Sequence, residues 1–135
     1  MNKTLAALKT RIDWQLNEVK QQQAVLNEEI TVLDEQMQVN AGQISEACAS
    51  PVYLLPEQEI ARLNFVIRQQ QLQDELTRKK DQLMTQQEIL RQKQTRLGTE
   101  LKMLEKYLEQ KAKEHAKNQE KEQQNFIDEW AIQRN

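Results

Sequence analysis

The chain has 135 residues, of which 38% are hydrophobic and 4% aromatic, with 22 glutamines but only two glycines and two prolines. So few loop-forming residues exclude a large compact core and favour two long helices. The net charge of −2 comes from 19 basic and 21 acidic residues mixed along the chain. This pattern argues against the basic stripe of a nucleic-acid-binding protein and against a polybasic membrane surface.

Two further features of the sequence bear on the cellular compartment. No apolar run is long enough for a signal peptide or a transmembrane helix, so we expect no membrane insertion. The single cysteine, Cys48, excludes an internal disulfide and is typical of a reducing compartment. We therefore expect a soluble, cytoplasmic protein.

The first helix is predicted over residues 3–47. Steps of alternately three and four residues define an apolar seam along it, as in an antiparallel coiled coil. Polar residues at Lys9, Gln23 and Asn40 share this register; such residues cost stability but fix the pairing. The apolar members of the seam are Leu5, Ile12, Leu16, Val19, Leu26, Ile30, Leu33, Met37, Ile44 and Ala47.

The only break falls at residues 48–56. Pro51 and Pro56 cannot both lie inside one helix, because each removes an amide and crowds the preceding turn. Pro56 followed by Glu57 and Glu59 is typical of a helix start, with carboxylates at the positive end of the helix dipole. A loop this short returns the chain antiparallel, which predicts an all-α helical hairpin over residues 1–135 with a longer second helix.

The second helix is predicted over residues 57–132. A leucine at every seventh position forms its core seam: Leu76, Leu83, Leu90, Leu97 and Leu104. Ile60, Leu63 and Ile67 are out of phase with these leucines by one position, which predicts a stutter at the start of the helix.

Folding the chain tightly at the loop predicts the pairing of the two helices. It places Ile44 near Ile60, Ile30 near Leu76 and Leu5 near Thr99. Residues 105–132 would then project beyond the first helix. Much of this projection is polar, and an unpaired polar helix is marginal in water, so we expect it to fray when free.

No enzyme is apparent in this sequence. His115 has no second histidine or clustered cysteine for a metal site, and Cys48 has no nearby base. A basic leucine zipper is excluded because residues 60–75 carry only Arg62 and Arg68 as basic residues. We therefore expect no catalytic residue, no cofactor and no metal.

Two apolar clusters are candidates for partner binding. At the tip, residues 52–55 with Leu63, Phe65 and Val66 either seal the end of the hairpin or present an exposed surface. Near the C-terminus, an apolar segment is either a partner anchor or a self-association stripe. We favour the anchor, since aromatic residues on a helix are frequent hot spots. This segment contains Phe126, Ile127, Trp130 and Ile132.

The turn PVYLLPEQEIARLNFVIRQQQ and the tail KEQQNFIDEWAIQRN resemble the FliJ/YscO family of type III secretion proteins. The resemblance implies a central stalk that engages the hexameric export ATPase and the cytoplasmic domain of the export gate. Some family members escort unloaded secretion chaperones. It implies an ATPase side with Phe126, Asp128, Glu129, Trp130 and Arg134, and a gate side at Tyr53, Leu54, Leu63 and Val66.

On this interpretation the chain is a non-enzymatic coupling protein, peripheral to a membrane-embedded apparatus and monomeric when free. Two other classes remain open. A self-assembling coiled-coil scaffold would pair the projecting helices of different chains. A holdase-type chaperone like prefoldin would insert β-hairpins between its helices, for which residues 50–56 are too few.

Overall fold

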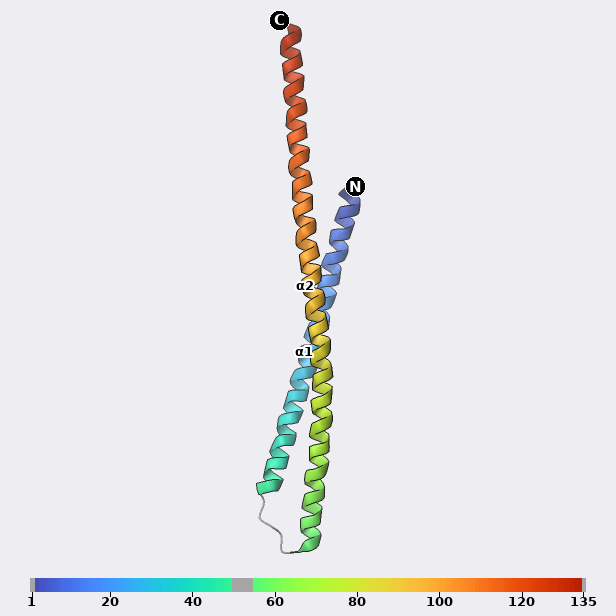
Figure 1. Ribbon diagram of the computed structural model, residues 1–135, viewed down its shortest axis with the longest axis vertical. Helices are drawn as coiled ribbons and strands as arrows, with labels where there is room; N and C mark the ends of the chain where they lie inside the picture. Colours follow the sequence, from blue (N-terminus) through green and yellow to red (C-terminus); the bar gives the residue numbers. More distant parts are fainter. Residues whose placement is uncertain (1, 50–54, 135) are drawn as a thin grey trace. The chain divides into compact units, whose positions relative to one another are not determined.

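The protein is a hairpin of two long helices, seen in a computed structural model that describes residues 2–49 and 55–134 (Figure 1). Helix α1 spans Asn2–Ala49 and helix α2 spans Pro56–Arg134, with 48 and 79 residues. The described residues contain no strand. The predicted all-α hairpin with a longer second helix is therefore confirmed.

The start of α2 follows the expected chemistry. The carbonyl oxygen of Leu55 accepts hydrogen bonds from the backbone amides of Gln58 and Glu59, both at 3.2 Å. Pro56 lacks an amide proton and occupies the first helical position, where none is needed. Glu57 and Glu59 lie in the first turn, where the helix dipole favours negative charge.

The chain forms two compact units, each containing a stretch of both helices. The central unit consists of Glu18–Lys93, and the terminal unit combines Met1–Asn17 with Gln94–Asn135. Each unit is described by itself below.

The central unit has a narrow heptad core. Val19, Leu26, Leu76 and Asn40 are buried. The other seam positions in this unit are half-buried, as expected for a two-helix layer that has no third element to cover it. These positions are Gln23, Ile30, Leu33, Met37, Ile44 and Ala47 on α1, and Val66, Gln69, Gln73, Lys80, Leu83, Gln87 and Leu90 on α2. The predicted apolar seam and the leucine repeat are thus confirmed in this unit.

The pairing of the helices in the central unit differs from the prediction by one heptad. The amide of Gln87 donates a hydrogen bond to Asn27 Oδ1, and Lys80 Nζ lies 2.7 Å from Asp34 Oδ1. These two contacts place Ile30 opposite Leu83, so the expected neighbour Leu76 was wrong. The opening turns of α2 consequently extend past the end of α1 (Figure 1).

A buried polar contact accounts for this register. Asn40, only 2% exposed, donates from Nδ2 to Gln73 Oε1 at 2.7 Å and to the carbonyl oxygen of Gln69 at 2.9 Å. A shift by one heptad would place Asn40 against Val66, which has no side-chain oxygen to replace Gln73 Oε1. A buried amide that loses a hydrogen-bond acceptor costs about 1–3 kcal/mol, which disfavours the shifted register.

The predicted stutter at the start of α2 is wrong. Ile60, Leu63 and Ile67 are 58%, 48% and 51% exposed. The half-buried residues here are Glu59, Arg62 and Val66, which continue the core pattern of the leucine heptad without a phase change. Because the heptad is kept, the three apolar residues remain on the surface of the helix.

The terminal unit buries Ile12, Leu97 and Leu104. Lys9 Nζ lies 3.9 Å from Glu105 Oε1, which places Leu5 beside Leu108 instead of Thr99. Leu108 is half-buried, and every described residue after it is exposed. The projecting segment therefore begins at residue 109, about one turn later than predicted, and continues as helix to Arg134.

Candidate partner-binding surfaces

The last three turns of α2 carry an exposed aromatic face. Phe126, Ile127 and Trp130 are 69%, 55% and 51% exposed. At about 100° per residue these side chains and Arg134 fall within about 100° of the helix circumference. The Arg134 guanidinium lies 4.3 Å from the centroid of the Trp130 ring, a cation–π contact that orients the indole. We call these four residues the C-terminal face.

The acidic residues predicted for the same site point elsewhere. Asp128 lies on the side of the helix away from Trp130, and Glu129 lies outside the C-terminal face, beside Phe126 and about 100° around the helix from Trp130. Asp128 Oδ1 accepts a hydrogen bond of 3.1 Å from Gln124 Nε2. Ile132, 75% exposed, follows Asp128 by one turn and shares its side. The five residues predicted for the ATPase side thus divide between two faces.

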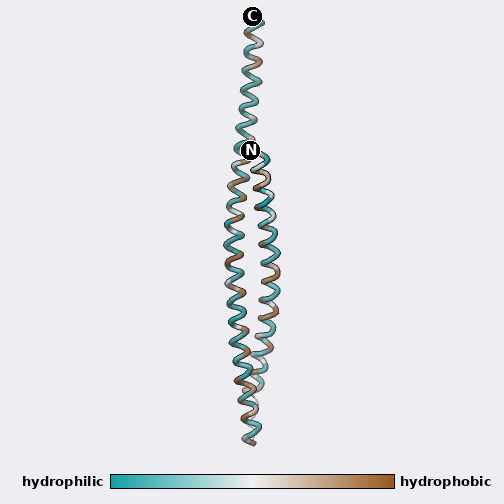
Figure 2. Tube along the Cα trace, turned by 90° about the vertical axis from the view of Figure 1, so that its right-hand side faces the viewer, coloured by the Kyte–Doolittle hydropathy of each residue, from teal (hydrophilic) through white to brown (hydrophobic). Residues whose placement is uncertain are grey.

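A polar stretch separates the C-terminal face from the paired part of the terminal unit. In Figure 2 it is the mostly hydrophilic segment that precedes the C-terminus. Its contacts are local: Lys113 lies 3.4 Å from Glu109, and the Lys111 ammonium lies 5.6 Å from the Tyr107 ring. Exposed pairs of this kind contribute about 0.3–0.5 kcal/mol each, so they support the helix only weakly.

The predicted gate side is only partly described. Tyr53 and Leu54 lie outside the described residues. Leu63 is 48% exposed, as a partner-binding residue requires, whereas Val66 is a half-buried seam residue. Exposed apolar area at this end comes instead from the out-of-phase residues Ile60 and Ile67, which neighbour Leu63 on the helix surface.

Arg62 ties the opening of α2 to the end of α1. Its Nη1 donates to the carbonyl oxygen of Ala47 at 3.0 Å, and its Nε donates to Glu59 Oε2 at 3.1 Å. The last carbonyls of α1 have no partner within their own helix and carry partial negative charge, so a guanidinium is a suitable cap. Arg62 is therefore a structural residue of the seam.

A long groove on one side of the central unit was not anticipated from the sequence. Three hollows of about 640, 660 and 670 Å³ follow one another along the hairpin. Neighbouring hollows share lining residues: Val25 in one case, and Val32, Gln36 and Lys79 in the other. The three hollows therefore form one continuous depression, which we call the valine groove.

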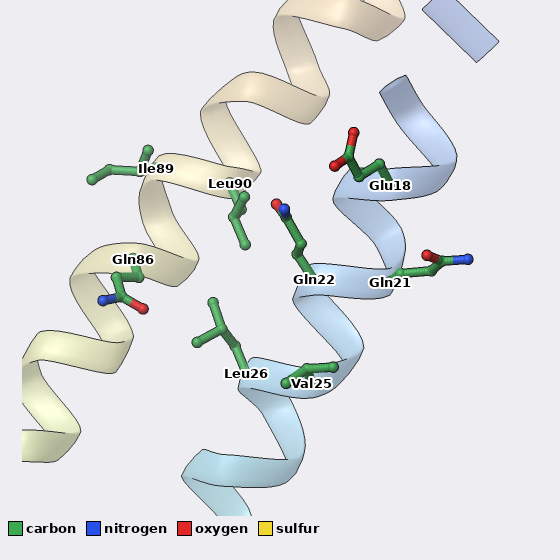
Figure 3. Close-up of a pocket in the computed structure, with 8 residues that line it drawn as sticks. All are labelled: Glu18, Gln21, Gln22, Val25, Leu26, Gln86, Ile89 and Leu90. Atoms are coloured by element: carbon green, nitrogen blue, oxygen red, sulfur yellow. The ribbon is translucent and has the colours of Figure 1, made fainter. Parts of the chain in front are cut away.

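Exposed apolar side chains of both helices line the valine groove. Val25, Val32 and Val39 of α1 are 57%, 47% and 62% exposed, and Leu72 and Ile89 of α2 are 40% and 59% exposed. Figure 3 shows one end of the groove, with Leu26 and Leu90 between the helices and Val25 and Ile89 further out. The signal in the sequence was the spacing of the three valines by seven residues, one position away from the core seam.

Two searches for other kinds of site gave negative results. Within residues 2–49 and 55–134, no group of three or more His, Cys, Asp and Glu side chains is placed to hold a metal ion. Neither helix, over its described length, contains a stretch that is apolar and long enough to span a bilayer.

Comparison with models of known families, with curated proteins and with solved structures found no match. The functional interpretation consequently depends on the geometry described above and on the resemblance of the turn and the tail.

Proposed function

We propose that this chain is a non-enzymatic stalk of a type III protein export apparatus, similar to the FliJ/YscO proteins. It would be a cytoplasmic protein at the base of a membrane-embedded machine and would couple a hexameric export ATPase to the cytoplasmic domain of the export gate. Secretion chaperones are further candidate partners.

The observation that carries the proposal is the unpaired end of α2. From residue 109 to Arg134 the helix is exposed on all sides, a length of about 39 Å at 1.5 Å per residue. It ends in the C-terminal face, where two aromatic rings and a guanidinium are held on one side. Aromatic residues and arginine on one helical face are suited to insertion between the subunits of a ring.

The loop end supports the second contact of the proposal. Ile60, Leu63 and Ile67 remain exposed there because the heptad continues past them. We assign the gate side to this patch together with Tyr53 and Leu54. Val66 is a residue of the core seam, so it would not contact the gate directly. It would affect gate binding only by holding α2 in place.

The test measures binding of this chain to the hexameric type III export ATPase of the same cell and stimulation of its ATP hydrolysis. The variants are Trp130→Ala, a truncation after Leu108, and the control Ile132→Ala on the other side of the same helix. We expect the truncation to abolish binding, Trp130→Ala to weaken it about tenfold or more, and Ile132→Ala to change it little. Full-length protein that neither binds nor stimulates the ATPase would refute the proposal.

A self-assembling scaffold is the second candidate, because the exposed C-terminal face could pair between chains. The two functions differ in their dependence on concentration. A stalk stays monomeric at micromolar concentration in light scattering, whereas a scaffold grows, and Trp130→Ala would stop that growth.

A further inference from the structure

The hollows of the valine groove are spaced as expected for a site that binds a third helix alongside α1 and α2. Its three hollows recur at the interval of the valines, seven residues or about 10.5 Å along α1. This interval equals the repeat of apolar side chains on a coiled-coil helix. A third helix would therefore insert one layer of apolar side chains into each hollow.

The rim of the groove is acidic. Four carboxylates line the hollows, and none of them forms an ion pair with a residue that the structure describes; they are Glu18, Glu28, Glu29 and Glu35. The only cation among the lining residues of the three hollows is Lys79. The rest of the polar lining consists of glutamines and Asn40.

From this combination we propose that the valine groove binds an amphipathic helix of another protein. That helix carries leucine, isoleucine or valine in a heptad stripe, flanked by lysine or arginine. It completes a three-helix bundle over the central unit. The bound helix covers the exposed valines, and its cations neutralise the four unpaired carboxylates.

The same charges argue against a second copy of this chain as the occupant. Two copies related by a twofold axis would place the acidic rims of their grooves against each other. The polar stretch at residues 111–124 of another copy does not fit either, because it has no large aliphatic side chain for the hollows. A basic partner helix meets neither objection.

The groove lies within the central unit, whereas the ATPase side of the proposed stalk lies in the terminal unit. Binding at the groove therefore does not depend on the proposed function. If the ATPase experiment fails, the proposal of helix binding at the groove still stands. If no helix binds at the groove, the proposed stalk function still stands.

The test uses two synthetic peptides of about 21 residues, three heptads long, each labelled with fluorescein. Both have leucine at the core positions. The flanking positions are lysine in one peptide and glutamate in the other. Fluorescence anisotropy with the full-length protein measures Kd for each. We expect the lysine peptide to bind at least tenfold more tightly, with an affinity that falls as salt is added.

Two variants of the protein separate the apolar and the charged contributions. V25A/V32A/V39A removes the exposed valines that line the groove, and alanine has the higher helix propensity, so circular dichroism should show an unchanged helical fold. E28K/E29K inverts part of the rim. We expect the first to weaken binding of the lysine peptide about tenfold or more, and the second to reverse the preference between the peptides.

Matched controls come from the opposite flank of α1. T31A/Q38A alters the residues immediately before Val32 and Val39 and should leave both Kd values unchanged. Equal affinity for the two peptides, or binding unaffected by V25A/V32A/V39A, would overturn the proposal. It would also be overturned by a homodimer in sedimentation experiments that V25A/V32A/V39A dissociates, since the occupant would then be a second copy.

Discussion

Asn40 Nδ2 lies 2.7 Å from Gln73 Oε1, and this contact between two core positions selects the pairing of α1 with α2 in the central unit. Several apolar layers would keep a leucine partner after a shift of one heptad, for example Ile30 with Leu76, since leucines recur at each seventh residue from Leu76 to Leu104. The amide of Asn40 discriminates between the two registers, because it is buried and needs an acceptor.

Replacing both members of this contact should therefore loosen the register. We expect Asn40→Leu with Gln73→Leu to preserve or raise the unfolding temperature, because apolar side chains replace a desolvated polar pair. The slipped pairing should at the same time become populated. Single Asn40→Leu should be less favourable, since it leaves Gln73 half-buried without its donor.

Crosslinking can measure the two registers in a Cys48→Ser background. Cysteines at Asn27 and Gln87 report the observed pairing, and cysteines at Asn27 and Lys80 report the slipped one. With a short bismaleimide, only the first pair should react in the otherwise unchanged protein. The cysteines at Asn27 and Lys80 should become crosslinked in the double leucine variant. If they do not react there, Asn40 does not set the register.

The two glycines offer a gain in stability. A Cβ atom added at Gly42 or Gly98 meets no atom within 4 Å. Alanine loses less conformational entropy than glycine on forming a helix, so each substitution to alanine should raise the free energy of unfolding by up to about 1 kcal/mol. Urea unfolding followed by circular dichroism would measure this. Lower stability of Gly98→Ala would indicate that this position needs glycine for close packing.

The projecting segment should contribute little to the stability of the hairpin. Truncation after Leu108 removes residues 109–134, which are all exposed, together with Asn135, so the midpoint of thermal unfolding should change little while total ellipticity falls. Leu104→Ala, by contrast, removes a side chain that is 8% exposed and should cost about 2 kcal/mol or more. A large drop in the midpoint on truncation would mean that residues beyond Leu108 pack against another part of the chain.

The acid titration of Glu88 provides a local test of the surface geometry. Hydrogen bonds from Arg91, at 2.9 Å from Nε and 2.6 Å from Nη2, lower the pKa of the Glu88 carboxyl. At a pH above the Glu88 pKa of the unfolded chain, this ion pair stabilises the folded state. The contribution is lost as the pH falls through the lowered Glu88 pKa of the folded chain. Both groups are fully exposed, so the effect on stability is small.

Nuclear magnetic resonance of the side-chain carboxyl carbon can follow this titration. The Glu88 pKa should rise towards its ordinary value in Arg91→Gln and in high salt. A Glu88 pKa that does not respond to Arg91→Gln would show that the pair does not form in solution.

The sequence predicted both helices to within a few residues, because proline placement and a heptad repeat are local signals. Pro56 defines the start of α2, and the leucines from Leu76 to Leu104 are buried or half-buried as predicted. The register could not be predicted in this way. It depends on which partner Asn40 finds, and a repeating pattern presents several equivalent choices.

The candidate surfaces were predicted unevenly for a similar reason. Phe126 and Trp130 were identified because large apolar residues follow a polar stretch. Asp128 and Glu129 were grouped with them by closeness in sequence, although helical geometry directs them elsewhere. The valine groove was missed because its residues come from both helices, and only the observed pairing brings Val32 and Leu72 to one side of the hairpin.

Polar residues occupy every second core position in part of α2, and they decide which helix the leucine heptad can pair with. The leucines alternate along the core with Gln73, Lys80, Gln87 and Gln94. If two α2 helices associated in parallel and in register, each of these residues would meet its own symmetry mate, including ammonium against ammonium at Lys80. Helix α1 avoids this conflict by providing Asp34 for Lys80 and Asn27 for Gln87. The heptad therefore favours its own first helix over a homodimeric leucine zipper.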